Sequence, residues 1–282
     1  MSKQTLLAVL AHPDDESFGM GGTLALYASR GVEVHLVCAT RGEVGDVTPE
    51  MLAGFHSIAE LRESELRCAA GILGLKEVHF LDYRDSGMPG SPDNQHPQAL
   101  AAQPLDEVAA NVVCYIRDLK PQVVLTFDPI GGYRHPDHIA IQRATVRAFE
   151  QAANPSFAQG SLPPYAPERL YFHIFPKGLL KFAVKLLPLI GKDPHKFGSN
   201  GDIDMVSIAA VDFPTNARIN IRSVLKKKEQ AGACHASQGG GRMGGGVITF
   251  FMRLFSGSED FMRAYPAVQK GEKIAMDLFQ GI

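Results

Sequence analysis

The chain has 282 residues, of which 45% are hydrophobic and 21% are charged, and 28 Lys and Arg against 30 Asp and Glu give a net charge of -2. This composition excludes a mainly disordered chain, and the lack of a basic excess argues against nucleic acid as a partner. A chain of this length buries enough surface to fold without disulfides or a structural metal.

Short apolar runs without polar alternation, typical of buried parallel strands, alternate with helical patterns in the first half of the chain. Such alternation predicts right-handed βαβ crossovers and an open parallel sheet. We therefore expect an α/β fold, a Rossmann-like three-layer sandwich with a mostly parallel sheet. The expected strands are Leu6–Leu10, Val32–Cys38, Val78–Leu81 and Val123–Phe127, and the expected helices are Gly21–Arg30, Phe55–Leu73, Leu105–Leu119 and one from His135 or Pro136 to Ala153.

The second half of the chain is less regular. No linker in it is long enough to separate two cores, so we expect one domain over residues 1–282. Residues 1–153 would form the α/β core, and residues 154–282 an irregular C-terminal extension that completes the sheet and the substrate pocket. Its expected elements are a loop at Ala153–Glu168, strands at Leu170–Phe175 and Val206–Val211, a helix at Pro214–Ala231 and a flexible glycine-rich segment at residues 239–246.

The cysteines show neither the spacing of a zinc knuckle nor that of a C-x-x-C pair, and most lie in apolar runs where a free thiol packs as a small hydrophobic group. They are Cys38, Cys68, Cys114 and Cys234. No segment has the length and apolarity of a membrane span or a signal peptide core. We therefore expect a cytoplasmic protein with reduced thiols and no stable membrane insertion. The apolar stretches Leu179–Leu189 and Val247–Phe255 are expected in the core or at a homo-oligomer interface.

Polar loops follow three of the predicted strands, at the edge where open parallel sheets bind ligands. They are Ala11–Glu16, Thr40–Asp46 and Asp128–His138. Histidines and carboxylates delivered to one place are the ligand set of a catalytic zinc, which has three protein ligands and one position open for water. The row of acids at positions 14–16 also needs a compensating cation or hydrogen bonds. Helix capping could explain each cluster alone, but both clusters fall at strand ends of one sheet.

The sequence A-H-P-D-D-E at residues 11–16, with H-P-D-H at residues 135–138, resembles the LmbE/PIG-L family of zinc-dependent N-acetylglucosamine-conjugate deacetylases. Residues 30–31, 40–46, 84–88, 131–133 and 233–238 look like the branch of this family that contains the mycothiol-pathway deacetylase. The resemblance covers nearly the whole chain and is weakest over residues 156–212 and after residue 239.

The resemblance implies that His12, Asp15 and His138 bind zinc, with another divalent metal such as Fe2+ as the alternative. It implies that Asp14 is the general base, which takes a proton from the water that attacks the acetamide carbonyl. His135 would act as an imidazolium that steadies the tetrahedral intermediate or protonates the leaving amine.

Further roles are expected from chemistry for Tyr133 and Asp137, and from the same resemblance for Arg62 and Asp85. Tyr133 would donate a hydrogen bond to the developing oxyanion, and Asp137 would orient a histidine ligand from behind. Arg62 and Asp85 would bind hydroxyl groups of the sugar or the aglycone. His235 lies at a position where the similar branch also has a histidine, but no role follows for it.

The expected function is hydrolytic removal of the acetyl group from an N-acetylglucosamine conjugate, a small-molecule amino sugar such as a GlcNAc-inositol, whose aglycone the sequence leaves open. One alternative is an amidase like those that cut mycothiol S-conjugates, and another is a non-catalytic sugar-binding protein. The glycines of Gly19–Gly22 do not indicate a dinucleotide-binding enzyme, because Leu24 occupies the place of the third glycine in G-x-G-x-x-G.

Overall fold

The computed structural model describes residues 3–158, 161–175, 177–191, 193–196, 201, 204–240 and 257–282. Its strands are β1 Thr5–Leu10, β2 Glu33–Cys38, β3 Glu77–Phe80, β4 Val123–Phe127, β5 Arg169–Ile174, β6 Ala217–Asn220 and β7 Ser258–Tyr265. They form one sheet in the order β3-β2-β1-β4-β5-β7-β6. Strands β1 to β5 pair in parallel, whereas β7 runs antiparallel to both of its neighbours. The mostly parallel sheet that the sequence predicts is confirmed.

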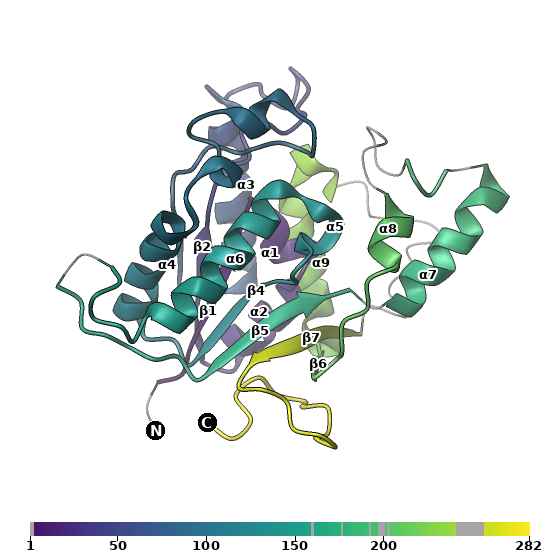
Figure 1. The fold of residues 1–282 in the computed structure, drawn as a ribbon. Coiled ribbons are helices and arrows are strands. Elements are labelled where there is room, and N and C mark those ends of the chain that lie inside the picture. The colour runs from purple at the N-terminus through teal and green to yellow at the C-terminus, as the bar shows by residue number, and fades with distance from the viewer. Residues whose placement is uncertain are drawn as a thin grey trace.

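Helices cover both faces of this sheet (Figure 1). On one face α4 Leu105–Leu119 packs against α6 Pro136–Gln151, and on the other α9 Leu225–Cys234 packs against α2 Gly21–Ser29 and α3 Ile58–Leu73. The predicted three-layer sandwich is thus confirmed. The remaining helical segments are α1 Asp15–Phe18, α5 Gly131–Arg134, α7 Lys177–Leu186, α8 Met205–Ala209, and the 3-10 turns η1 Pro92–Gln95, η2 Leu100–Ala102, η3 Leu187–Ile190, η4 Arg222–Val224 and η5 Ala236–Gln238.

The strands and helices expected before residue 153 are all present, with small differences at their ends. Burial explains this success, because every residue of β1 and of β4 is buried and such strands appear as continuous apolar runs. Helix α3 begins three residues later than expected, at Ile58, because the Ser57 side chain caps it by accepting a hydrogen bond from the Glu60 N–H.

The strand predicted at Val206–Val211 is wrong, because most of this run belongs to helix α8. The Asp204 carboxylate caps the helix and accepts hydrogen bonds from the N–H groups of Val206 and Ser207. A short apolar run fits a strand and a buried helical turn equally well, and the cap decides between them.

The helix predicted at Pro214–Ala231 is wrong in its first half, where residues 217–220 form strand β6 and the helix starts at Leu225. In β6, Ala217 and Ile219 are buried and the residues between and after them are exposed, which is the period of two of a half-buried strand. Strand β7 was not expected at all. Residues 241–246 of the glycine-rich segment and the stretch Val247–Phe255 lie outside the described residues.

The amino terminus of α2 is the place where a dinucleotide-binding protein of this topology would hold a phosphate. Here the N–H groups of Gly22 and Thr23 donate to the carboxylate of Glu259 in β7, at 3.0 and 2.7 Å. Glu259 is buried and pairs with Lys228 Nζ at 2.5 Å. The protein's own carboxylate therefore occupies the anion position, which agrees with the sequence argument against a dinucleotide.

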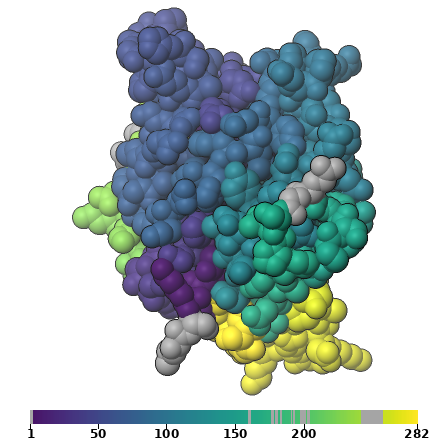
Figure 2. Space-filling view, turned by 90° about the vertical axis from the view of Figure 1, so that its left-hand side faces the viewer, coloured from purple at the N-terminus to yellow at the C-terminus, as the bar shows by residue number. Residues whose placement is uncertain are grey.

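Both ends of the described chain lie at the amino ends of the central strands. Lys3 and Gln4 lead directly into β1, and Arg169 at the start of β5 donates to the backbone carbonyl of Gln280. Figures 1 and 2 show the purple N-terminal residues and the yellow C-terminal segment at the same end of the molecule. Within the described ranges, no helix is both long and apolar enough to cross a membrane.

The structure joins Cys68 of α3 and Cys234 of α9 in a disulfide, at a sequence separation of 166. The prediction of reduced thiols is therefore wrong for this pair, whereas Cys38 and Cys114 are free. Local spacing along the chain carries no sign of the pairing, because it arises from the packing of α3 against α9.

We expect thiol titration of the unreduced, denatured protein to detect Cys38 and Cys114 only, and to detect all four cysteines after reduction. Replacing Cys68 and Cys234 together by Ser should lower the free energy of unfolding by about 2–4 kcal/mol, because the disulfide restricts the unfolded chain. Denaturant unfolding of both proteins measures the difference. Four reactive thiols in the unreduced protein would contradict the disulfide.

Candidate metal centre

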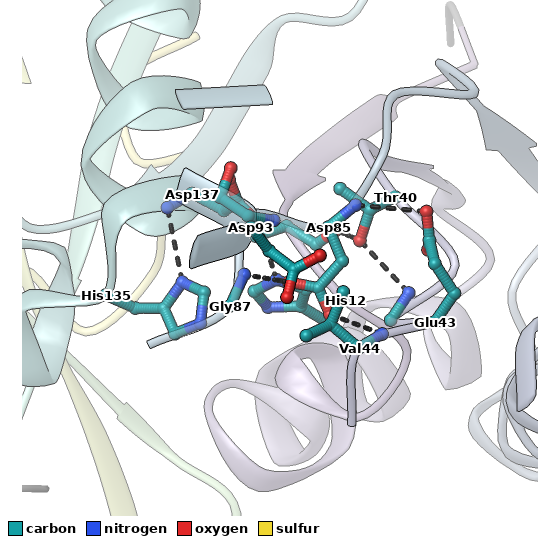
Figure 3. Close-up of polar contacts among 12 residues, drawn as sticks. His12, Thr40, Glu43, Val44, Asp85, Gly87, Asp93, His135 and Asp137 are labelled. Atoms are coloured by element: carbon teal, nitrogen blue, oxygen red, sulfur yellow. Dashed lines mark hydrogen bonds and ion pairs between the residues drawn. The ribbon is translucent and has the colours of Figure 1, made fainter. Parts of the chain in front are cut away.

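Loops at the carboxyl ends of three strands meet at one place. His12 follows β1, Asp85 follows β3, and the segment after β4 leads to His135 and Asp137 at the start of α6. Figure 3 shows His12 between Asp85 on one side and the pair His135 and Asp137 on the other. The side chains of these four residues are all buried. The predicted clusters are thus brought together, as expected for the carboxyl edge of a parallel sheet.

The three predicted metal ligands lie at mutual distances that suit one ion. The His12 Nδ1 atom is 3.2 Å from His138 Nε2 and 3.6 Å from Asp15 Oδ2, and His138 Nε2 is 3.2 Å from Asp15 Oδ1. Two ligand atoms held about 2.0–2.1 Å from a tetrahedral zinc ion lie about 3.4 Å apart. Ligand atoms of His12, His135 and His138 also fall within 4.8 Å of one another, so His135 faces the same position.

The second nitrogen of His12 has its own partners. His12 Nε2 donates to Asp137 Oδ2 at 3.1 Å and lies 3.5 Å from Asp85 Oδ1. Asp137 is fully buried and also accepts hydrogen bonds from the backbone N–H of Ser86, at 2.8 Å, and from its hydroxyl. With its proton on Nε2, His12 presents the lone pair of Nδ1 to Asp15 and His138. A carboxylate behind a ligating imidazole is the usual support of a metal-bound histidine.

Burial and neighbouring charges act against each other in this cluster. Burial alone would lower the pKa of His12, but Asp85, followed by Asp137, raises it well above its ordinary value. Burial alone would raise the pKa of Asp15, but His138 and then His12 hold it well below its ordinary range. Without an ion, the carboxylates therefore favour a proton on the His12 imidazole. A divalent cation would balance the same negative charge, and its binding would release that proton.

Asp14 lies beside the ligands and lines a cavity of about 140 Å³. Its Oδ2 atom accepts a hydrogen bond from Arg62 Nη2 at 3.1 Å. Burial raises the pKa of Asp14 to about 6, and Arg62 offsets part of that effect. A pKa near neutrality suits a general base. The other residues that line the cavity are Asp15, Phe18, Gly19, Met20, Phe127, Gly132, Tyr133, His138, His173 and Phe175.

His135 and Tyr133 lie on the α6 side of the centre. The Asp137 N–H donates to His135 Nδ1 at 3.2 Å, which leaves the proton of the neutral ring on Nε2. Burial, and then His12 and His138, lower the pKa of His135 to about 2. These effects favour the neutral ring, and the expected imidazolium role of His135 stays a prediction. Burial raises the pKa of Tyr133, so its hydroxyl keeps its proton. The centroid of its ring lies 4.9 Å from that of the His138 ring.

The two predicted substrate ligands both bind protein groups here. Arg62 is buried, and its Nη1 and Nη2 atoms donate to the carbonyls of Gly42 and Pro13 at 2.9 and 2.6 Å. A Cβ at Gly42 would lie 1.9 Å from Arg62 Nη1, so only glycine permits this approach. Asp85 accepts from the Gly87 N–H at 2.8 Å, beside His12 (Figure 3). A direct contact of Arg62 or Asp85 with substrate stays a prediction.

Sequence analysis missed several supports of the centre. Ser86 holds Asp137, and the Phe127 ring stacks on His138 with centroids 4.0 Å apart. Glu16 and His235 form a buried pair behind Asp14 at a sequence separation of 219. Ser86 adjoins Asp85 in a segment that the family resemblance already includes, so that signal was present. The partner of Glu16 could not be found from local pattern.

Comparison with known proteins shows that the chain is similar to deacetylases over most of its length. Over 242 residues the chain is 37% identical to the 1D-myo-inositol 2-acetamido-2-deoxy-alpha-D-glucopyranoside deacetylase of Geodermatophilus obscurus, covering 83% of this chain and 82% of the relative. It is 34% identical over 303 residues to the enzyme named deacetylase 2 of the same substrate from Catenulispora acidiphila, covering 99% of this chain and 97% of that one.

Among solved structures, the N,N'-diacetylchitobiose deacetylase of Pyrococcus horikoshii matches with a TM-score of 0.62 at 24% identity, over 93% of this chain and 84% of that chain, which supports the fold. The model of the PIG-L family, described as GlcNAc-PI de-N-acetylase, matches residues 7–149, and this range contains the loops of the metal centre. The chain therefore belongs to the PIG-L family of de-N-acetylases.

Proposed function

We propose that this protein is a metal-dependent hydrolase that removes the acetyl group from a GlcNAc-inositol conjugate. The observation that carries the proposal is the approach of His12 Nδ1, His138 Nε2 and Asp15 to within 3.6 Å of one another beside Asp14. The names of the relatives, which match 83% or more of the chain, support the amino sugar linked to inositol as substrate.

We assign the metal to His12, Asp15 and His138. Two imidazoles and a carboxylate form the set of three protein ligands typical of catalytic zinc, and Fe2+ accepts the same donors. When bound, a zinc ion would activate a water molecule and polarise the acetamide carbonyl. Asp137 keeps His12 in the required tautomer, and Phe127 stacks on the ring of His138.

Asp14 is the proposed general base. Its carboxylate lines the cavity next to Asp15, and the buried Arg62 guanidinium fixes one of its oxygens. Burial favours its protonated form, so Asp14 is able to accept the proton of the attacking water and to pass that proton to the leaving amine. The neutral His135 then has no need to supply a proton.

Two donors complete the proposed site. The Nε2–H of neutral His135 and the hydroxyl of Tyr133 would donate hydrogen bonds to the carbonyl oxygen as it gains negative charge. His135 is buried and Tyr133 is half-buried, and preorganised donors in such a site stabilise this charge more strongly than water does. In this mechanism His135 acts as a hydrogen-bond donor instead of a charged acid.

We further propose that the chain is a single domain in which residues 154–282 help to build the substrate pocket. His173 of β5 and Phe175 after it line the cavity together with Asp14 and Tyr133. A homo-oligomer and a cytoplasmic location stay predictions, and the Cys68–Cys234 disulfide runs against the reduced thiols that the latter assumed.

The zinc-loaded protein is expected to release acetate and a free amine from GlcNAc-inositol in equal amounts. Fluorescent labelling of the amine and an enzymatic acetate assay measure the two products. A mycothiol S-conjugate, which lacks the acetylated sugar amine of this substrate, serves as the comparison. Faster cleavage of the S-conjugate would favour the amidase alternative, and binding of GlcNAc-inositol without turnover would favour a sugar-binding protein.

His12→Ala is expected to abolish both metal binding and activity, because an open catalytic site has no protein ligand to spare. Metal content by mass spectrometry and amine release are measured on the same preparations. The matched control is His79→Ala, which removes a histidine of edge strand β3 outside the centre. This control should keep one ion per chain and wild-type turnover. A His12→Ala protein that retains its ion would refute the assigned ligand set.

Asparagine at Asp14 and at Asp15 should fail in different ways. Asp15→Asn is expected to lose metal and to recover part of its activity in excess zinc, because a neutral amide is a poorer zinc ligand than a carboxylate. Asp14→Asn should keep its metal and lose about 10²–10⁴-fold in kcat without recovery. KM should change little, since the base acts mainly in the transition state.

The opposite result would exchange the two roles. In that case Asp14→Asn would be metal-free and regain activity in excess zinc, while Asp15→Asn would keep its full metal content.

A further inference from the structure

The backbone at Asp14 has a conformation that residues other than glycine rarely adopt, with φ 126° and ψ -30°. Its N–H donates to Glu16 Oε2 at 3.0 Å, and its carbonyl accepts from the N–H groups of Ser17 and Phe18 at 3.0 and 2.9 Å. Such a conformation persists only where the surroundings over-determine it. The Glu16 carboxylate is therefore one of the groups that keep Asp14 in place.

Glu16 depends in turn on His235. Both side chains have an exposed fraction of 0%. His235 Nε2 donates to Glu16 Oε1 at 2.7 Å, and the Ser17 hydroxyl donates to the same oxygen at 2.5 Å. A fully buried carboxylate needs such donors, because water cannot reach it. Without His235, Glu16 would lose a principal partner and could turn away from the Asp14 N–H.

His235 is itself held firmly, and α3 supplies the anchors on both sides of it. Cys234 is joined to Cys68, and Ser237 donates from its N–H and its hydroxyl to Glu65 at 2.8 and 2.6 Å. Arg62, Glu65 and Cys68 are spaced three residues apart, so they share one face of α3. Because Arg62 binds the Asp14 carboxylate, the same helix face restrains the side chain of Asp14 and the segment of His235.

We propose that His235 is a positioning residue, which acts through Glu16 to hold the Asp14 carboxylate in the orientation that proton transfer requires. The proposal rests on the proposed function, in which Asp14 is the base. His235 and Glu16 are fully buried and are not among the described residues that line the cavity. Proton transfer is sensitive to small displacements, and a shift of about 1 Å can cost 10²-fold in rate.

The test compares His235→Leu with His235→Gln in the zinc-loaded full-length protein. Leucine removes the donor, so kcat for GlcNAc-inositol should fall by about 10²-fold while KM and zinc content stay unchanged. Glutamine places an amide nitrogen close to the position of Nε2 and should restore most of kcat. A loss of kcat that the donor restores, at constant KM and metal content, is not expected from a purely structural role.

Ala231→Gly is the control for general weakening of α9, because it lowers helix propensity without removing any contact of Glu16. Its kcat should equal that of the wild type even if its melting temperature falls. Wild-type kcat in His235→Leu, equal losses in His235→Leu and His235→Gln, or a loss that follows zinc content would each overturn the proposal.

A crystal structure of His235→Leu provides a readout that needs no activity. We expect the Asp14 backbone to leave its positive φ, or its carboxylate to turn from Arg62, and an unchanged Asp14 would overturn the positioning role. If the wild type released no amine from GlcNAc-inositol, the proposed function would fail, and this structure would still decide whether His235 holds Asp14.

Discussion

The hydrogen bond from His12 Nε2 to the buried Asp137 carboxylate determines which way the His12 ring faces. Because Nε2 binds Asp137, the Nδ1 atom faces His138 and Asp15. Its distances to His138 Nε2 and Asp15 Oδ2 suit a shared metal ion. Asp137 lies in the first turn of α6 after β4, and it also accepts from Ser86 in the loop after β3. One carboxylate thus connects the loops of three strands, and the position of each loop depends on the other two.

The first half of the fold could be predicted because its information is local. Strands β1 and β4 are buried along their whole length and are visible as apolar runs, and the histidines and acids directly follow them. The predictions for the second half of the chain were wrong where the local sequence patterns are ambiguous. The short apolar run Val206–Val211 fits the pattern of a strand and that of a helix equally well. Strand β6 is short, and its position depends on pairing with β7.

In the candidate site, the local sequence indicated which residues gather but not what state they are in. The pKa of His135 is lowered by burial and by the rings of His12 and His138, and only the assembled site places these groups together. Likewise, the partners of Glu16 and of the α2 terminus lie 219 and more than 200 residues away, at His235 and Glu259. Contacts of such range have no periodicity that sequence analysis could detect.

The position of β7 has a consequence for how the chain is made. Among the strands of the described residues β7 comes latest in the chain, yet it lies between β5 and β6. Until β7 emerges from the ribosome, β6 has no strand to pair with, β5 keeps an open edge, and the α2 terminus lacks Glu259. The nascent chain can therefore assemble β1 to β5 early but cannot complete the β5-β7-β6 edge of its sheet before β7 has been made. During that interval the open edge of β5 is a template for pairing with other chains, and chaperones would have their main opportunity to act.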